Sequence, residues 1–202
     1  MSRPDSSAQD DKGLHSSTRG YRRLSRRSLL SYWWTLPVAG TLGTFGWLGL
    51  RAGRILTRKE KPGEPAFIAG PAQQVAQLSA LPTEWDSLEF SYQGTPAVLL
   101  RLPQPVPGGI TAGEQHFAAF SRLCTHQGCP VVVVRDPEVL ALAYNYRAAE
   151  AQHPQLGCPC HYSVFDPLKA GEAVFGQATL PLPRIALEVR GNQLYATGSE
   201  SI

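Results

Sequence analysis

Residues able to do chemistry gather in two short segments, which we call the first knot and the second knot. The first knot spans residues 124–129 and reads Cys-Thr-His-Gln-Gly-Cys; the second spans residues 158–163 and reads Cys-Pro-Cys-His-Tyr-Ser. All four cysteines of the chain lie in the knots, together with two of its five histidines. Thiolate sulfur and imidazole nitrogen are ligands for zinc and for iron–sulfur clusters. The pattern therefore predicts a metal site built from two loops.

The residue types alone leave three interpretations open. Two disulfides would use all four cysteines, but they would leave His126 and His161 unexplained at matched places. A zinc site with cysteine and histidine ligands fits the residue types better. A [2Fe–2S] cluster in which two histidines replace two cysteines on one iron fits them as well.

The charge of the chain is unevenly distributed. Residues 1–28 hold seven basic and three acidic side chains (7 − 3 = +4), and residues 51–61 hold five and one (5 − 1 = +4). Residues 62–202 hold seven basic and twelve acidic side chains (7 − 12 = −5). A nucleic-acid-binding domain carries positive charge on its fold, so this acidic body argues against a nucleic-acid partner.

The N-terminal part of the chain is predicted to hold it at a membrane. Residues 1–28 are polar, and we expect a disordered cytoplasmic tail in which Arg26 and Arg27 resemble a twin-arginine export signal. Residues 29–50 carry no charge and would reach roughly 33 Å as a helix, which predicts one uncleaved transmembrane anchor. We expect the N-terminus in the cytoplasm and the body on the outer, extracytoplasmic face of the cell membrane.

The rest of the chain is expected to form a linker and an all-β head. Residues 51–71 are expected to form a linker or hinge, because residues 59–71 have the proline- and glycine-rich composition of a semi-stiff tether. Residues 72–202 carry alternating and apolar runs separated by turn residues, which predicts a head made of strands. The expected strands are 87–93, 96–102, 116–123, 130–135, 185–190 and 193–197. Both knots then fall in loops between strands.

The stretch between the knots is longer than a minimal two-loop site needs. We call residues 136–157 the insert, and we expect Val139–Ala151 to form a strand followed by a helical turn. The insert is a candidate docking element or a decorated loop. The histidines outside the knots are expected to be structural or solvated: His15, His116 and His153.

The two knots resemble the paired motifs of Rieske [2Fe–2S] proteins, C-T-H-x-G-C followed by C-P-C-H-x-S. The resemblance implies an antiparallel β-sandwich head with two cluster-binding loops. The ligands that it implies are Cys124 and Cys158 on one iron and His126 and His161 on the other. It also implies a disulfide between Cys129 and Cys160. Histidine ligands raise the reduction potential, and their outer nitrogens can exchange a proton as the cluster changes oxidation state.

Residues beside the knots refine this resemblance. Ser163 resembles the serine that hydrogen-bonds a cluster sulfide. Phe165 stands where many high-potential members carry a tyrosine that donates to a ligand cysteine, so we expect a potential at the lower end of the respiratory Rieske range. Gln127 and Tyr162 depart from the family's usual leucine and glycine. The loop 176–183 replaces a proline-rich covering loop and is similar to that of the Rieske subunit of arsenite oxidases.

The resemblance implies electron transfer within a multi-subunit enzyme. The first expectation is the iron–sulfur subunit of a quinol–cytochrome c reductase. It would accept one electron from quinol, in this case menaquinol, and pass it to a c-type cytochrome beside a cytochrome b-type membrane subunit. The alternative is the Rieske small subunit of an arsenite-oxidase-type molybdoenzyme. A zinc-stabilised binding module without a redox role is the third expectation.

Overall fold

A computed structural model of the chain describes residues 26–57, 59–147 and 153–201. The predicted tail, except for its last three residues, lies outside this described part. The chain divides into two compact units, Met1–Gly53 and Arg54–Ile202. We call the second unit the head.

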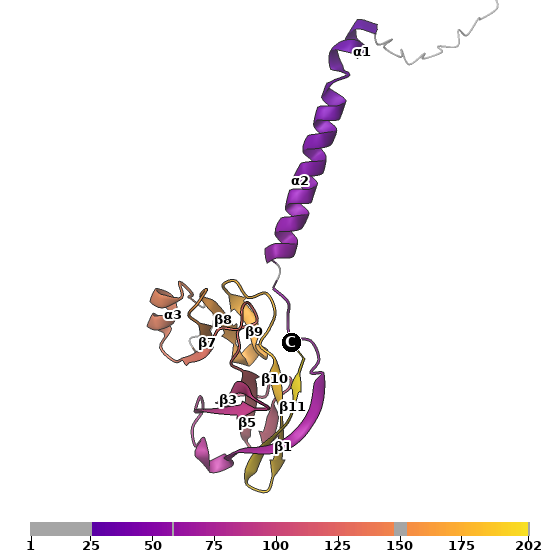
Figure 1. The fold of residues 1–202 in the computed structure, drawn as a ribbon. Helices are drawn as coiled ribbons and strands as arrows, with labels where there is room; N and C mark the ends of the chain where they lie inside the picture. The colour runs from indigo at the N-terminus through magenta and orange to yellow at the C-terminus, as the bar shows by residue number, and fades with distance from the viewer. Residues whose placement is uncertain (1–25, 58, 148–152, 202) are drawn as a thin grey trace, which may run out of the picture. The chain divides into compact units, whose positions relative to one another are not determined.

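The described residues of the first unit are helical, apart from a turn at residues 33–34. Helix α1 spans Arg26–Tyr32, and α2 spans Thr35–Thr57 and so runs on into the first residues of the head (Figure 1). The prediction of one continuous helix over 29–50 is therefore wrong in its bounds. Pro37 explains why α2 starts at Thr35. Proline has no N–H to donate, so a helix tolerates it in the first turn but not in the interior.

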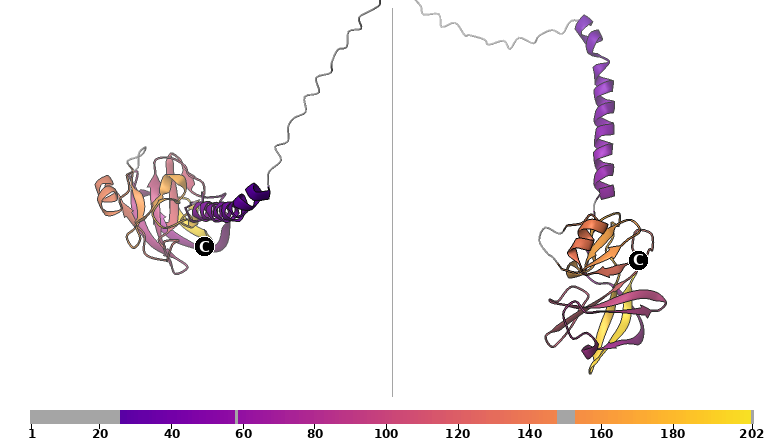
Figure 2. Two further views of the ribbon diagram at one scale, coloured as in Figure 1. Left: turned by 90° about the horizontal axis from the view of Figure 1, so that it is seen from above. Right: turned by 90° about the vertical axis from the view of Figure 1, so that its left-hand side faces the viewer.

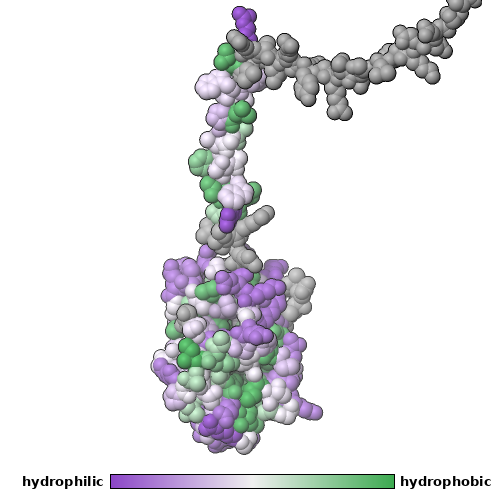
Figure 3. Space-filling model, turned by 90° about the vertical axis from the view of Figure 1, so that its right-hand side faces the viewer, coloured by the Kyte–Doolittle hydropathy of each residue, from purple (hydrophilic) through white to green (hydrophobic). Residues whose placement is uncertain are grey.

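Large apolar side chains along α2 are exposed to solvent, as the space-filling view shows (Figure 3). Leu36, Leu42 and Phe45 are each about 70% exposed or more. Within the described ranges of the chain, no helix combines the length and the apolar character needed to cross a membrane.

The head is built from two antiparallel sheets, which confirms the expected all-β class. The large sheet has the strand order β1-β11-β10-β5-β3-β2, with β4 beside β5. Its strands are β1 Phe67–Gln77, β2 Ser87–Tyr92, β3 Thr95–Leu102, β4 Ile110–Ala112, β5 Gln115–Ser121, β10 Arg184–Arg190 and β11 Gln193–Glu200. The small sheet has the order β6-β7-β8-β9, with strands β6 Val132–Val134, β7 Gln155–Cys158, β8 Ser163–Asp166 and β9 Glu172–Phe175. The two sheets occupy opposite ends of the head (Figure 2).

The apolar run in β3 is buried because both of its faces are covered. Successive side chains of a strand point to opposite faces. Val98 and Leu100 join a core that includes residues of the small sheet, among them Leu156. Leu99, which lies between them, joins a second core on the other face of the large sheet. This packing ties the small sheet to the centre of the large one.

Two elements differ from the predictions. Strand β1 begins at Phe67, inside the predicted linker, and pairs with β11 along its whole length. In the insert, Pro137–Ala143 forms helix α3 in place of the expected strand. Asp136 caps this helix by accepting a hydrogen bond from the amide of Glu138 at 2.8 Å, and proline is favoured at the first helical position.

A buried ion pair joins the end of the chain to the start of β10. The guanidinium of Arg184 donates from Nε and Nη2 to the carboxylate of Glu200, at 2.8 and 2.5 Å. Burial acts to raise the pKa of Glu200, but the hydrogen bonds from the Arg184 side chain and backbone outweigh it, and the net pKa is lowered. The pair therefore stabilises the fold above the ordinary glutamate pKa of 4.5 and loses that contribution as the pH falls through the lowered value.

Glu200→Gln is expected to lower the free energy of unfolding at pH 7 by about 2–3 kcal/mol, because it leaves a buried guanidinium without its counter-ion. The variant should also lose less stability than the wild type when the pH is lowered below 4.5, since the titrating group is gone. Urea unfolding at pH 7 and pH 3.5 measures both effects. Glu188→Gln is the matched control, because its pair with Arg190 is about half exposed and surface pairs contribute little. Equal effects of the two substitutions would contradict this account.

Candidate metal centre

The first knot is a tight loop between β5 and β6. Leu123 and Pro130 form an isolated bridge at its base. Within the loop, the amide of Cys124 donates to the carbonyl of Cys129 at 2.9 Å, and the amide of Gly128 donates to the carbonyl of Cys124 at 2.8 Å. These bonds fold the loop back on itself, with the Cys124 thiol buried.

The second knot is the turn of the β7–β8 hairpin. Cys158 ends β7 and pairs with Ser163, the first residue of β8. Cys158 and Ser163 are buried, whereas His161 and Tyr162 at the tip are exposed. The hairpin register thus holds a thiol inside and presents an imidazole at the surface.

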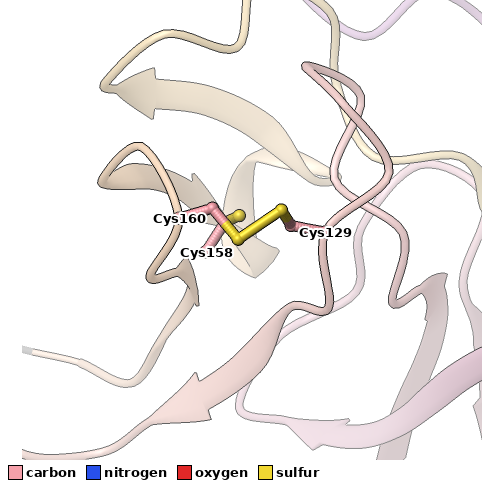
Figure 4. A group of neighbouring side chains, drawn as sticks. All are labelled: Cys129, Cys158 and Cys160. Atoms are coloured by element: carbon pink, nitrogen blue, oxygen red, sulfur yellow. A yellow bond between two sulfur atoms is a disulfide. The ribbon is translucent and has the colours of Figure 1, made fainter.

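A disulfide between Cys129 and Cys160 joins the two knots, with 6.5 Å between the Cα atoms, as the resemblance implies (Figure 4). The sulfur of Cys158 lies beside it, and the three sulfurs are all within 4.8 Å of one another. Disulfide sulfurs carry no thiolate and are poor metal ligands. Of these three cysteines, only Cys158 therefore remains available to a metal.

The two remaining thiols, Cys124 and Cys158, are both free and buried. Burial raises the pKa of Cys158, and the adjacent Cys124 raises it further, against an opposing contribution from the backbone amides of Cys160 and His161. Two thiolates so close together repel each other, and in a buried site a cation compensates that repulsion. The pair therefore fits a metal centre with two cysteine ligands.

The histidines of the two knots also meet. The ring centroids of His126 and His161 are 4.8 Å apart, and the rings are nearly perpendicular, at 88°. Nδ1 of His126 is buried and has no hydrogen-bond partner among the described residues. An unpaired buried nitrogen costs about 1–3 kcal/mol, and coordination of a metal would satisfy it. The four donors of the two knots therefore fit a cluster with two thiolate and two imidazole ligands.

A loop at residues 176–183, which we call the covering loop, contacts both knots. A Cβ atom on Gly176 would lie 2.3 Å from the carbonyl oxygen of Tyr162, so the close approach requires glycine. The amide of Ala178 donates to Oγ of Ser163 at 3.0 Å, and Oγ1 of Thr125 donates to the carbonyl of Leu180 at 2.8 Å. Because Ser163 Oγ accepts the bond from Ala178, its hydroxyl hydrogen remains available as a donor toward the site.

One residue near the centre was missed by the sequence reasoning. Lys59, in the predicted linker, donates from Nζ to the carbonyls of Gly176 and Ala178, at 2.9 and 2.7 Å. Burial lowers the pKa of this ammonium. No local signal marks Lys59, because its partners lie more than a hundred residues further along the chain.

The other histidines of the head lie in separate contacts. His116 Nδ1 is hydrogen-bonded with Thr111 Oγ1 at 3.0 Å. His153 stacks on Trp85, with ring centroids 5.1 Å apart, and its Nε2 lies 3.5 Å from the carboxylate of Asp166. These contacts agree with the expected structural roles. His15 lies outside the described residues.

Phe165→Tyr is expected to raise the reduction potential of the centre, because a phenol can donate a hydrogen bond that stabilises negative charge on a sulfur ligand. Phe165 is fully buried in the core that contains Cys124 and Cys158. A shift on the order of 60 mV corresponds to a tenfold change in the one-electron equilibrium. A redox titration followed by EPR measures it, and an unchanged or lower midpoint would contradict the expectation.

Comparison with known proteins identifies the pattern of the knots. The family model for the Rieske [2Fe–2S] domain matches residues 72–186. The iodate reductase subunit IdrB of Denitromonas iodatirespirans is 35% identical over 135 residues, which cover 65% of this chain and 64% of that subunit. The cytochrome bc1 complex Rieske iron-sulfur subunit of Corynebacterium diphtheriae is 37% identical over 73 residues, which cover 36% of this chain and 14% of that subunit. The chain thus matches under two thirds of the length of either relative.

Among solved structures, the soluble domain of Rieske protein II from Sulfolobus acidocaldarius is similar, with a TM-score of 0.47 and 23% identity. The alignment covers 64% of this chain and 78% of that one.

Proposed function

Because this chain belongs to the Rieske [2Fe–2S] family, we propose that it is the electron-transfer subunit of an oxidoreductase complex similar to iodate reductase. In this proposal the substrate reacts on another subunit, and the present chain relays single electrons. The [2Fe–2S] cluster supplies a one-electron couple whose potential depends on its ligands and on hydrogen bonds to its sulfurs.

The residues of the two knots have distinct roles in this proposal. The ligands are Cys124, His126, Cys158 and His161. Cys124 and Cys158 are buried, which keeps water from the thiolate side. His161 is exposed, so its outer nitrogen can hold or release a proton and face a redox partner. Ser163 retains a hydroxyl hydrogen to donate toward the cluster, since its oxygen already accepts from Ala178.

The segment before β1 is hydrogen-bonded to the covering loop, to the start of β10 and to the end of β11. Lys59 donates to two carbonyls of the covering loop, and the amide of Glu60 donates to the carbonyl of Thr179 at 2.7 Å. Further along, the carbonyl of Gly63 accepts from Arg184 at 3.0 Å, and the amide of Ala66 lies 3.4 Å from its acceptor on Glu200. Residues 59–66, which belong to the predicted linker, are therefore part of the head.

A head that carries electrons by swinging between two partners needs a segment free to change conformation. Hydrogen bonds from Lys59 and Glu60 to the covering loop lie within the head, so residues 59–66 are not that segment. A relay that stays docked on one partner needs no such movement. The observation that carries the choice of a fixed relay is the match to an iodate reductase subunit, at 35% identity over 135 residues.

A second candidate is the Rieske subunit of a menaquinol–cytochrome c reductase, with quinol, a cytochrome b-type subunit and a c-type cytochrome as partners. The match to a cytochrome bc1 Rieske subunit favours it, at 37% identity over 73 residues. Phe165 suits a low-potential quinol, because it offers no donor to the cluster sulfurs.

Purification of the chain through a C-terminal tag, under mild detergent, distinguishes the candidates. We expect it to co-purify with a large oxidoreductase subunit, and we expect iodate or a related oxyanion to reoxidise the reduced Rieske EPR signal of the complex. Co-purification with a cytochrome b-type protein, together with menaquinol-dependent reduction of cytochrome c, would replace the first candidate by the second.

We also propose that the N-terminal unit attaches the complex to the cell membrane, with the head on the outer face. The exposed apolar side chains of α2, such as Leu36 and Phe45, support this attachment. Alkaline carbonate washing of membranes tests it: the chain should remain in the pellet, and its release into the supernatant would contradict integral attachment.

A further inference from the structure

Lys59 and its neighbour hold the covering loop from the segment before β1. Nζ of Lys59 donates to the carbonyl of Gly176 at 2.9 Å and to that of Ala178 at 2.7 Å. The amide of Glu60 donates to the carbonyl of Thr179 at 2.7 Å. All these bonds lie inside the head.

The same stretch of the loop contacts Ser163. The amide of Ala178 donates to Oγ of Ser163 at 3.0 Å, and both residues are buried. A Cβ atom on Gly176 would lie 2.4 Å from Cα of Ser163, so the two backbones touch there. The two residues whose carbonyls accept from Lys59 are therefore the two that contact Ser163.

The hydroxyl of Ser163 has a hydrogen to donate toward the proposed ligands. In the described part of the chain its one hydrogen bond is the one that its oxygen accepts from Ala178. A buried donor without an acceptor is costly. Ser163 is directly paired with Cys158 in the hairpin, and directly opposite side chains lie on the same face of a sheet. Ser163 can therefore donate to sulfur of a cluster held there.

The charge of Lys59 also has to be considered. None of the ion pairs among the described residues includes Lys59. A positive charge near a cluster raises its reduction potential by itself, whatever the geometry of Ser163. Lys61 carries the same charge two residues further along and is exposed, so it offers a control for charge alone.

We propose that Lys59 is a positioning residue for the cluster: by holding the covering loop, it keeps Ala178 bonded to Ser163 and the serine hydroxyl hydrogen directed to the cluster sulfur. The inference rests on the ligand set proposed above. A donor to a cluster sulfur stabilises the reduced state, so loss of the hold on the loop lowers the reduction potential. One electron enters on reduction, and Ser163 keeps its proton.

Lys59→Met tests the proposal, because it keeps an unbranched stem and removes the ammonium donors. We expect the equilibrium between the reduced and oxidised cluster to shift toward the oxidised form about threefold to tenfold, where tenfold is 59 mV for one electron. Lys61→Met removes the same charge, which is screened by solvent, and should shift it by less than about twofold. The full chain in its purified complex is titrated, with the Rieske EPR signal as the readout.

A double-mutant cycle tests whether Lys59 acts through Ser163. Ser163→Ala alone should shift the midpoint in the same direction as Lys59→Met. Adding Lys59→Met to Ser163→Ala should shift it by less than about twofold more, because the donor is already gone. Full additivity of the two shifts would overturn the proposal, and so would equal shifts in Lys59→Met and Lys61→Met.

Hydrogen–deuterium exchange gives a readout that requires no electron transfer. The amide of Ala178 is buried and hydrogen-bonded, and Lys59→Met should speed its exchange by about tenfold, whereas Lys61→Met should not. Unchanged exchange in Lys59→Met would overturn the hold of Lys59 on the loop. Co-purification with a cytochrome b-type protein would replace the first candidate function and leave this inference standing. Absence of a Rieske signal from the wild type would overturn the ligand set, and this inference with it.

Discussion

Replacement of His161 by alanine is expected to abolish the [2Fe–2S] cluster. His161 and His126 meet at the junction of the two knots, 4.8 Å apart between ring centroids. Loss of one imidazole leaves an iron with an incomplete donor set in a site where the second thiol pair is locked in a disulfide. We expect complete loss of the Rieske EPR signal and of acid-labile sulfide, with the β-sheet circular dichroism retained.

His116→Ala is the matched control for this experiment. His116 lies on β5 and is hydrogen-bonded with Thr111, so its loss should leave the EPR signal and the iron content unchanged. A His161→Ala protein that kept a full Rieske signal would refute the ligand assignment. A wild-type protein that contained zinc and no iron would instead support the zinc-stabilised module.

Replacement of both Cys129 and Cys160 by serine is expected to produce the second large effect. The disulfide closes a loop with a sequence separation of 31 residues. By lowering the entropy of the unfolded chain, such a link stabilises the fold by about 3–4 kcal/mol. The knots should then separate more readily, and the cluster should bleach at lower urea concentration. The double variant is preferable to a single one, because an unpaired thiol beside Cys158 would compete as a ligand.

Urea titration followed by the visible absorbance of the cluster and by tryptophan fluorescence measures this effect. Treatment of the wild-type protein with a thiol reductant should lower the urea concentration at the unfolding midpoint, as the double substitution does. An unchanged midpoint in the double variant would show that the covering loop, through its bonds to Thr125 and Ser163, holds the knots without help from the disulfide.

The centre and the hairpins were predictable because their signals are local. The strands predicted at 87–93 and 96–102 pair as the β2–β3 hairpin, because an alternating run, the turn residues Gln93-Gly94 and an apolar run follow one another in the sequence. The strands predicted at 185–190 and 193–197 likewise pair with each other, as β10 and β11. The knots carry their residue types within six positions each, so their spacing alone indicates a metal site.

Strand β1 was missed because it contains Gly70 and Pro71, which normally interrupt a strand. The pairing with β11 shifts register between Ala69 and Gln73, and this irregularity accommodates the proline, which has no N–H for the ladder. Helix α3 was missed for another reason: its short apolar run fits a strand as well as a helix, although the Asp136-Pro137 cap signal was present. The contacts of Lys59 join distant segments and have no local signal.

The pairing of β1 with β11 also bears on how a stable fragment of the head could be prepared. The family match, residues 72–186, begins inside β1 and ends before β11. A fragment cut at those limits would lose β11 and residues 187–190 of β10, and the exposed edge that remains would be open to intermolecular pairing. A fragment that starts at Lys59 and runs through Glu200 keeps β1, β10 and β11 whole and retains the bonds to the covering loop, and it is the one suited to crystallisation.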